Sequence, residues 1–192
     1  TREELNLPTD KKIILLQGAG IKIQRGAEEA VAAMQHINNA VLLIIGGGDA
    51  IENLKLEIKS LELEDKVIVL PKMKPEELYQ YTCNADIGLS LDKATNLNYQ
   101  FSLPNKLFDY VYAGVPVLAS PLTEIKSFIE KYKVGVCIEN HTAQHLADKM
   151  TYMLTSTDYN IWKANTKTAA QENSWDKEKQ VWINIINEIK SK

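Results

Sequence analysis

Six short runs of β-branched and leucine-rich residues recur along this chain, and longer segments with apolar residues at helical spacing separate them. The runs are Ile13–Gln17, Val41–Gly46, Val67–Leu70, Ile87–Ser90, Val115–Ala119 and Val134–Ile138. Strands that are apolar almost throughout are typical of a parallel sheet covered on both faces. The alternation therefore predicts the α/β class, with a doubly wound, Rossmann-like sheet of six parallel strands.

Several residues mark where the helices begin and end. Pro75, followed by two glutamates, is typical of a first helical turn, and Pro104 begins another helix that Gly114 ends. From about 158 to 192 the chain carries no strand signal and predicts two amphipathic helices. No low-complexity linker or repeat interrupts the 192 residues, so we expect a single domain.

Charge and hydropathy exclude some classes of partner. The 22 basic and 25 acidic side chains give a net charge of −3, which provides no general attraction to nucleic acid. No apolar run approaches the roughly 20 residues of a transmembrane helix. Cys83 and Cys137 stand far apart in apolar contexts and predict two buried thiols of a reducing compartment. Because the chain starts at Thr1, we expect it to be a fragment.

The first candidate site is the glycine-rich loop between Gly18 and Gly26, which follows the first strand and leads into a helix. Gly18 and Gly20 allow a phosphate to approach the backbone, and Lys22 and Arg25 add positive charge. The loop matches neither the dinucleotide fingerprint nor the Walker motif. A solvated tight turn is the alternative interpretation.

A second glycine loop, Gly46-Gly47-Gly48-Asp49, follows the second strand. Glycine at Gly47 permits close approach to a ligand, but a plain turn into the next helix uses such residues equally well. The residues alone favour neither interpretation.

The third candidate surrounds the helix that begins at Pro104. Backbone amides before and within its first turn form a potential anion site. The residues involved are Ser102, Leu103, Pro104, Asn105 and Lys106. Lys106 and Asp109 share one face of that helix, and a carboxylate there can accept hydrogen bonds from ribose hydroxyls. A surface helix with an ion pair is the alternative.

The whole run from Ser102 to Ser120 closely resembles a signature of GT-B-type glycosyltransferases. More narrowly, it is similar to the large retaining group 1, or family 4, class that includes sucrose, mannosyl and lipopolysaccharide transferases. The resemblance covers nearly the whole chain. Its other parts are Gly18–Gly26, Val41–Asp49, Val67–Leu78, the strand at Asn84–Leu89 and the tail with Ser174-Trp175.

By this resemblance the chain is the C-terminal, donor-binding domain, and the N-terminal acceptor domain of the same polypeptide is missing. Asp109 takes the place of the family's ribose-binding acid, which is usually Glu. Arg25 matches the basic residue that contacts the donor's pyrophosphate, and Lys72 and Met73 lie where backbone groups meet the base. The class generally needs no metal ion, so we expect a nucleotide-sugar substrate and no cofactor.

The implied reaction is transfer of a hexose-type sugar with retention, in the cytoplasm or at the inner face of a membrane. Arg25 is the expected catalytic residue because it can stabilise charge on the leaving diphosphate. The chain departs from the family at Ala19, where a basic residue is usual, and at Phe101, where a second Glu often stands. These departures motivate one alternative, a non-catalytic sugar-nucleotide or protein-binding module. A sugar-nucleotide epimerase, which shares the fold, is a second alternative. The fragment is expected to be inactive alone.

Overall fold

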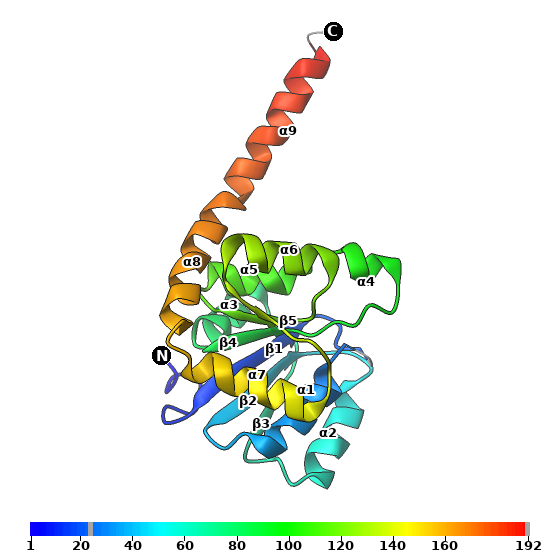
Figure 1. Cartoon of the computed structure of the whole chain (residues 1–192), viewed down its shortest axis with the longest axis vertical. Coiled ribbons are helices and arrows are strands. Elements are labelled where there is room, and N and C mark those ends of the chain that lie inside the picture. The colour runs from blue at the N-terminus through cyan, green and yellow to red at the C-terminus, as the bar shows by residue number, and fades with distance from the viewer. Residues whose placement is uncertain (23–24, 191–192) are drawn as a thin grey trace.

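The computed structural model describes residues 1–22 and 25–190 and contains one six-stranded sheet (Figure 1). Its strands are β1 (Lys12–Gly18), β2 (Ala40–Gly46), β3 (Val67–Leu70), β4 (Ile87–Ser90), β5 (Val117–Ala119) and β6 (Gly135–Cys137). All neighbouring strands pair in parallel, in the order β3-β2-β1-β4-β5-β6. The predicted doubly wound α/β fold is confirmed, and its strand order reverses between β1 and β4.

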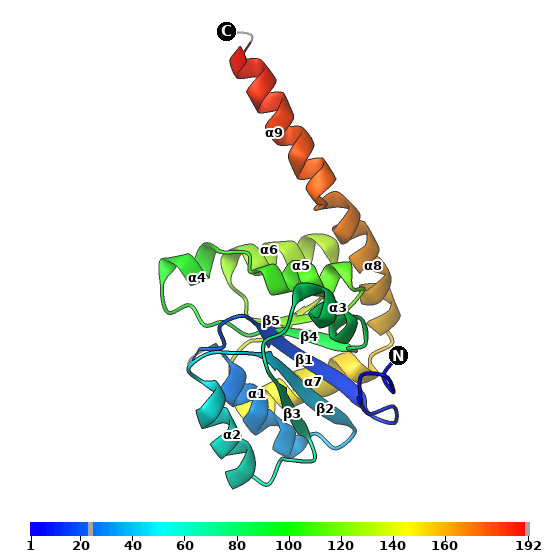
Figure 2. The ribbon, with the colours of Figure 1, turned by 180° about the vertical axis from the view of Figure 1, so that it is seen from behind.

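Helices cover both faces of the sheet, as the front and back views show (Figures 1 and 2). One face carries α1 (Ala27–Ala33), which the 3₁₀ turn η1 (Met34–His36) extends, together with α2 (Ile51–Ser60) and α7 (Ala143–Thr155). The other carries α3 (Pro75–Cys83), α5 (Asn105–Tyr112) and α6 (Thr123–Tyr132). The short helix α4 (Leu97–Phe101) lies at the rim, beside the carboxyl ends of the strands.

Successive residues of the central strand enter two separate cores, because side chains alternate between the faces of a sheet. Ile14 and Leu16 of β1 pack in the core beneath α1, α2 and α7. Ile13 and Leu15 pack in the core beneath α5 and α6. The central strand β1 therefore contributes to the packing of both helical layers.

The predicted helix boundaries agree with the structure. Pro75 occupies the first turn of α3, where its missing N–H costs no hydrogen bond. Pro104 directly precedes α5, and Gly114 follows the end of that helix with a φ of 76°, a left-handed conformation that suits glycine. Strand β5 begins two residues later than predicted because Val115 N–H donates to Tyr110 O and completes the end of α5.

The tail forms two helices, as predicted: α8 (Tyr159–Glu172), which packs on the body, and α9 (Trp175–Lys190), which projects away from it (Figure 1). The exposed large apolar residues of α9 are Trp175, Val181, Trp182, Ile183, Ile185, Ile186 and Ile189. The last two predicted tail residues lie outside the described part. No helix in that part is long and apolar enough to cross a membrane.

Both cysteines are free thiols, but the prediction that both are buried was wrong for one of them. Cys137 is partly buried, and burial raises the pKa of its thiol to about 11. Cys83 is exposed because it lies in the last turn of α3, on the solvent side of that helix.

Candidate functional site

Two adjacent cavities open at the carboxyl edge of the sheet, beside the point where the strand order reverses between β1 and β4. Their volumes are about 250 Å³ and about 520 Å³. Both are lined by the end of β1 and the start of α5. The shared residues are Gln17, Gly18, Ala19, Asn105 and Lys106. Ligands of doubly wound folds bind in this position.

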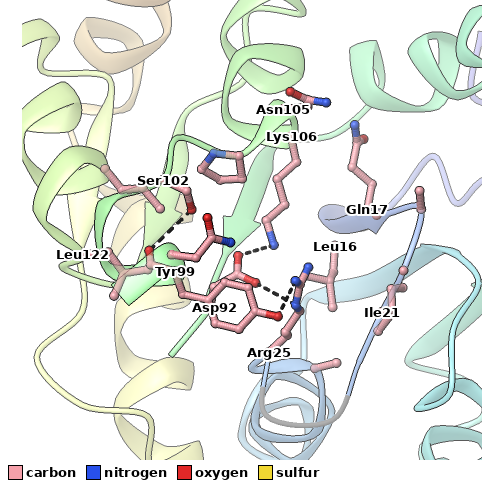
Figure 3. Close-up of a pocket in the computed structure, with 17 residues that line it drawn as sticks. Leu16, Gln17, Ile21, Arg25, Asp92, Tyr99, Ser102, Asn105, Lys106 and Leu122 are labelled. Carbon is pink, nitrogen blue, oxygen red and sulfur yellow. Dashed lines mark hydrogen bonds and ion pairs between the residues drawn. The ribbon is translucent and has the colours of Figure 1, made fainter. Parts of the chain in front are cut away.

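The smaller cavity holds a cluster of charges (Figure 3). Lys106 Nζ lies 2.7 Å from Asp92 Oδ2, and Arg25 Nε lies 3.5 Å from Asp92 Oδ1. Arg25 also donates from Nη2 to Tyr99 Oη at 2.6 Å, and its guanidinium carbon lies 4.6 Å from the centre of the Tyr99 ring. Two cations against one carboxylate leave this cavity with an excess positive charge.

The N-terminus of α5 adds to that positive potential. Ser102, Pro104 and Asn105 line the smaller cavity, and the first amides of an α-helix have no partner inside the helix. The helix dipole favours an anion at this end. Amides, a guanidinium and an ammonium thus converge on one small space, which is suited to phosphate groups.

The larger cavity is more apolar and contains the second carboxylate, Asp109. Burial raises the pKa of Asp109 above its ordinary value, and a 3.0 Å hydrogen bond from Gln17 Nε2 to Asp109 Oδ2 opposes that rise. Lys72 and Met73, which follow β3, also line this cavity, together with Leu78 of α3. A carboxylate between an apolar wall and a cationic cavity can accept hydrogen bonds from a sugar hydroxyl.

Tyr110 fixes the geometry beneath both cavities. Its side chain is fully buried, and its hydroxyl accepts a hydrogen bond from Gln17 N–H at 3.2 Å. The same hydroxyl lies 3.2 Å from the carbonyl oxygens of Leu15 in β1 and Leu89 in β4, and burial raises the pKa of Tyr110. Helix α5 is therefore tied to both central strands at the level of the site.

The second glycine loop has a structural role in packing against the first loop. A Cβ on Gly46 would lie 1.9 Å from Gly18 O, and one on Gly48 would lie 2.2 Å from Ile21 O. Ile21 N–H donates to Gly47 O at 2.6 Å. Close contact between the two loops thus explains Gly46 and Gly48 without a ligand, whereas a Cβ on Gly47 would meet nothing within 4 Å.

Most of the predicted site residues come together at the two cavities. Those that line one or both are Gly18, Gly20, Arg25, Lys72, Met73, Ser102, Pro104, Asn105, Lys106 and Asp109. Among the described residues, Lys22, Gly47 and Leu103 are not part of either lining. Lys22 is exposed to solvent, and Leu103 remains 39% exposed.

Three residues of the site were not predicted from the sequence: Gln17, Asp92 and Tyr99. Gln17 directly precedes the glycine that ends β1, and Asp92 follows β4 by two residues. Both positions lie at the carboxyl ends of strands, so inspection of every strand end would have found them. Tyr99 carries no such signal, because the fold alone brings α4 to Arg25.

The family model described as "Glycosyl transferases group 1" matches residues 1–172. The chain belongs to this family. A D-inositol 3-phosphate glycosyltransferase from Xylanimonas cellulosilytica is 23% identical over 190 residues, covering 96% of this chain and 44% of the relative. The chain thus spans less than half the length of this curated relative.

Solved glycosyltransferases share the fold. HepE from Anabaena, solved with UDP and glucose, superposes with a TM-score of 0.81 at 15% identity, covering 97% of this chain and 51% of HepE. Sucrose-phosphate synthase from Thermosynechococcus elongatus gives 0.79 at 22% identity, covering 97% and 48%. A group 1 glycosyltransferase C-terminal domain from Francisella tularensis gives 0.68 at 13% identity, covering 89% of each chain. The architecture is that of a GT-B glycosyltransferase domain.

Proposed function

We propose that this chain is the nucleotide-sugar-binding, C-terminal domain of a glycosyltransferase that transfers a hexose-type sugar with retention. The observation that carries the proposal is the pairing of the two cavities. One gathers Arg25, Lys106 and the α5 amides, and the other places Asp109 beside an apolar wall. Family membership supports the transfer reaction, and HepE, with the same fold, was solved with UDP-glucose.

The donor fits the two cavities in one direction. The base occupies the edge near Lys72 and Met73, and the ribose hydroxyls donate to Asp109. The diphosphate then lies over Gly18, at the shared border, and extends toward Arg25 and Lys106. Each group meets a partner of matching chemistry: apolar surface for the base, a carboxylate for hydroxyls and cations for phosphate.

The proposed catalytic role of this domain is stabilisation of the leaving group. Cleavage of the bond between sugar C1 and the diphosphate places negative charge on the departing oxygen. Arg25 and Lys106 stabilise that charge more in the transition state than in the ground state. Loss of one such donor costs about 3 kcal/mol, or roughly a hundredfold in rate. Because protein cations and amides meet this charge, we propose that the step needs no metal ion.

We further propose that an N-terminal acceptor domain of the same polypeptide completes the enzyme. The chain spans about half the length of the relatives, and α9 exposes a row of large apolar residues that packing on another domain would cover. The isolated chain is then expected to bind donor without transferring sugar.

Calorimetric titration with UDP, GDP, ADP and their sugar conjugates tests the proposal, on the wild type, Asp109→Ala and Arg25→Ala. We expect saturable binding of one nucleotide, weakened at least tenfold by each change. Asp148→Ala removes an exposed carboxylate of α7 and is the matched control, expected to bind as the wild type does. Absence of binding by any nucleotide would contradict the proposal and favour a degenerate module. Product analysis after incubation without an acceptor tests the epimerase alternative, because an epimerase would convert the donor itself.

A further inference from the structure

Asp92 is the one acidic residue among the described residues that line the smaller cavity, and it lies between the two cations (Figure 3). It is 6% exposed and follows β4 at the centre of the sheet. Arg25 reaches it from the loop that leads to α1, and Lys106 reaches it from α5 on the opposite layer. One buried carboxylate thus connects the two sides of the site.

The two contacts of Asp92 differ in kind. Its Oδ2 makes a 2.7 Å ion pair with Lys106 Nζ, whose side chain is nearly buried. Its Oδ1 lies 3.5 Å from Arg25 Nε, and among the described residues neither of these buried atoms has a hydrogen-bond partner. Hydrogen-bonding capacity therefore remains on both the carboxylate and the guanidinium, inside the cavity that we assign to the diphosphate.

We infer that Asp92 is an internal counter-ion that holds Arg25 and Lys106 in place and competes with the donor diphosphate for them. In the empty site its charge offsets part of the repulsion between two partly buried cations. A diphosphate that approaches the same cations attracts them and is repelled by Asp92. At least one of the two cations therefore leaves Asp92 and contacts a phosphate oxygen. Asp92 is thus a positioning residue that limits product affinity. This role rests on the proposed donor-binding function.

Asp86 provides a matched control elsewhere in the same sheet. It directly precedes β4, at the opposite end of that strand, and is 8% exposed. Like Asp92 it lies between two cations, with Arg2 Nη2 at 2.9 Å and Lys12 Nζ at 3.0 Å. Asp86→Asn therefore removes one negative charge from a similarly buried position that lies far from both cavities.

The test compares pyrophosphate, UDP and uridine binding by calorimetry in the wild type, Asp92→Asn, Asp92→Glu and Asp86→Asn. We expect Asp92→Asn to tighten binding of pyrophosphate and UDP by on the order of tenfold, because one nearby negative charge is removed from a partly buried site. Uridine affinity stays unchanged because uridine carries no phosphate. Asp92→Glu keeps the charge and retains wild-type affinities. Asp86→Asn lowers only the melting temperature.

Each outcome decides between the two proposals. If the wild type binds neither pyrophosphate nor any of UDP, GDP and ADP, the proposed donor site is wrong and the role of Asp92 fails with it. If the wild type binds pyrophosphate and a nucleotide and Asp92→Asn binds them equally or more weakly, only the counter-ion role is wrong. Equal tightening in Asp86→Asn would also overturn it, because the effect would then follow net charge alone.

A measurement on the wild type keeps the inference testable if Asp92→Asn does not fold. In a crystal structure of the chain with UDP, we expect Lys106 Nζ or Arg25 to contact a phosphate oxygen and to have moved away from Asp92. Retention of the 2.7 Å pair between Lys106 and Asp92 and the 3.5 Å approach of Arg25, with phosphate bound on other groups, would contradict the exchange.

Discussion

Gln17 donates a 3.0 Å hydrogen bond from Nε2 to Oδ2 of Asp109, across the border between β1 and α5. Thr82 of α3 lies on the other side of Gln17, with its hydroxyl 2.8 Å from Gln17 Oε1. The carboxylate of Asp109 fixes the orientation of the amide, because the opposite orientation would point the Gln17 oxygen at an acceptor, whereas the Thr82 hydroxyl can donate or accept. Asp109 is thereby held with one carboxylate oxygen engaged in a hydrogen bond.

Nucleoside binding should weaken in acid through protonation of Asp109. Burial raises the pKa of this carboxyl, so its charge is lost at a higher pH than for an ordinary aspartate. As pH falls through the raised pKa, the protonated group becomes a poorer acceptor for ribose hydroxyls. Titration with the nucleoside of the bound nucleotide measures this without interference from phosphate ionisation. Asp109→Asn should give a flat profile; an unchanged profile would assign the titration to another group.

Removing the Gln17 side-chain donor should move this acid transition to higher pH. Its hydrogen bond lowers the pKa of Asp109, so Gln17→Leu leaves burial unopposed and raises that pKa further. In Gln17→Leu the acid transition of nucleoside binding is therefore expected at a higher pH than in the wild type. Gln144→Leu, an exposed change on α7, is the control. A shift to lower pH would show that Gln17 does not stabilise the carboxylate.

Arg25 and Lys22 carry the same charge in one loop but should differ in their effect on diphosphate binding. Arg25 lines the smaller cavity and is held by Tyr99, whereas Lys22 is exposed and outside it. Loss of a charged hydrogen-bond donor costs about 1.5–3 kcal/mol, so Arg25→Ala should weaken UDP binding by at least tenfold. Lys22→Ala should change it by less than about twofold. Equal losses would show that only the charge of the loop matters.

Gly88 in β4 should not tolerate a side chain, because Tyr110 occupies the space. A Cβ at this position would lie 2.4 Å from Cγ of the Tyr110 ring, which is fully buried. Overpacking of this kind costs about 1–3 kcal/mol, so Gly88→Ala should lower the free energy of unfolding by that amount in urea titrations. Gly20→Ala, with nothing within 4 Å of its Cβ, should leave it nearly unchanged. Similar losses in both variants would contradict the packing account.

Helix α9 should contribute little to the stability of the body. The described side chains of α9 are exposed, and the helix projects away from the sheet (Figure 2). A chain ending after Ser174 should keep its melting temperature within a few degrees and its UDP affinity, while self-association measured by sedimentation decreases. A large fall in melting temperature would mean that α9 packs on the body in solution.

Local patterns were sufficient to predict the fold, and most of the candidate site residues named from the sequence and its family resemblance line the two cavities. Continuous apolar runs predicted six parallel strands, and Pro75, Pro104 and Gly114 marked helix ends that the structure confirms. The glycines of the second loop could not be interpreted locally. Gly46 and Gly48 cannot carry a side chain because Gly18 and Ile21 occupy the space, and these residues come close to them only when the strands pair.

The sequence by itself determined the class of fold, because hydrophobic periodicity is a local property of the chain. Its resemblance to group 1 glycosyltransferases indicated the family and singled out Arg25 and Asp109 as candidate site residues. Only the tertiary structure decided the electrostatics of the site. Arg25, Asp92 and Lys106 are far apart along the chain and belong to three different elements, yet they form one charge cluster. Electrostatic interaction depends on separation in space and on burial, and the packing of the sheet determines both.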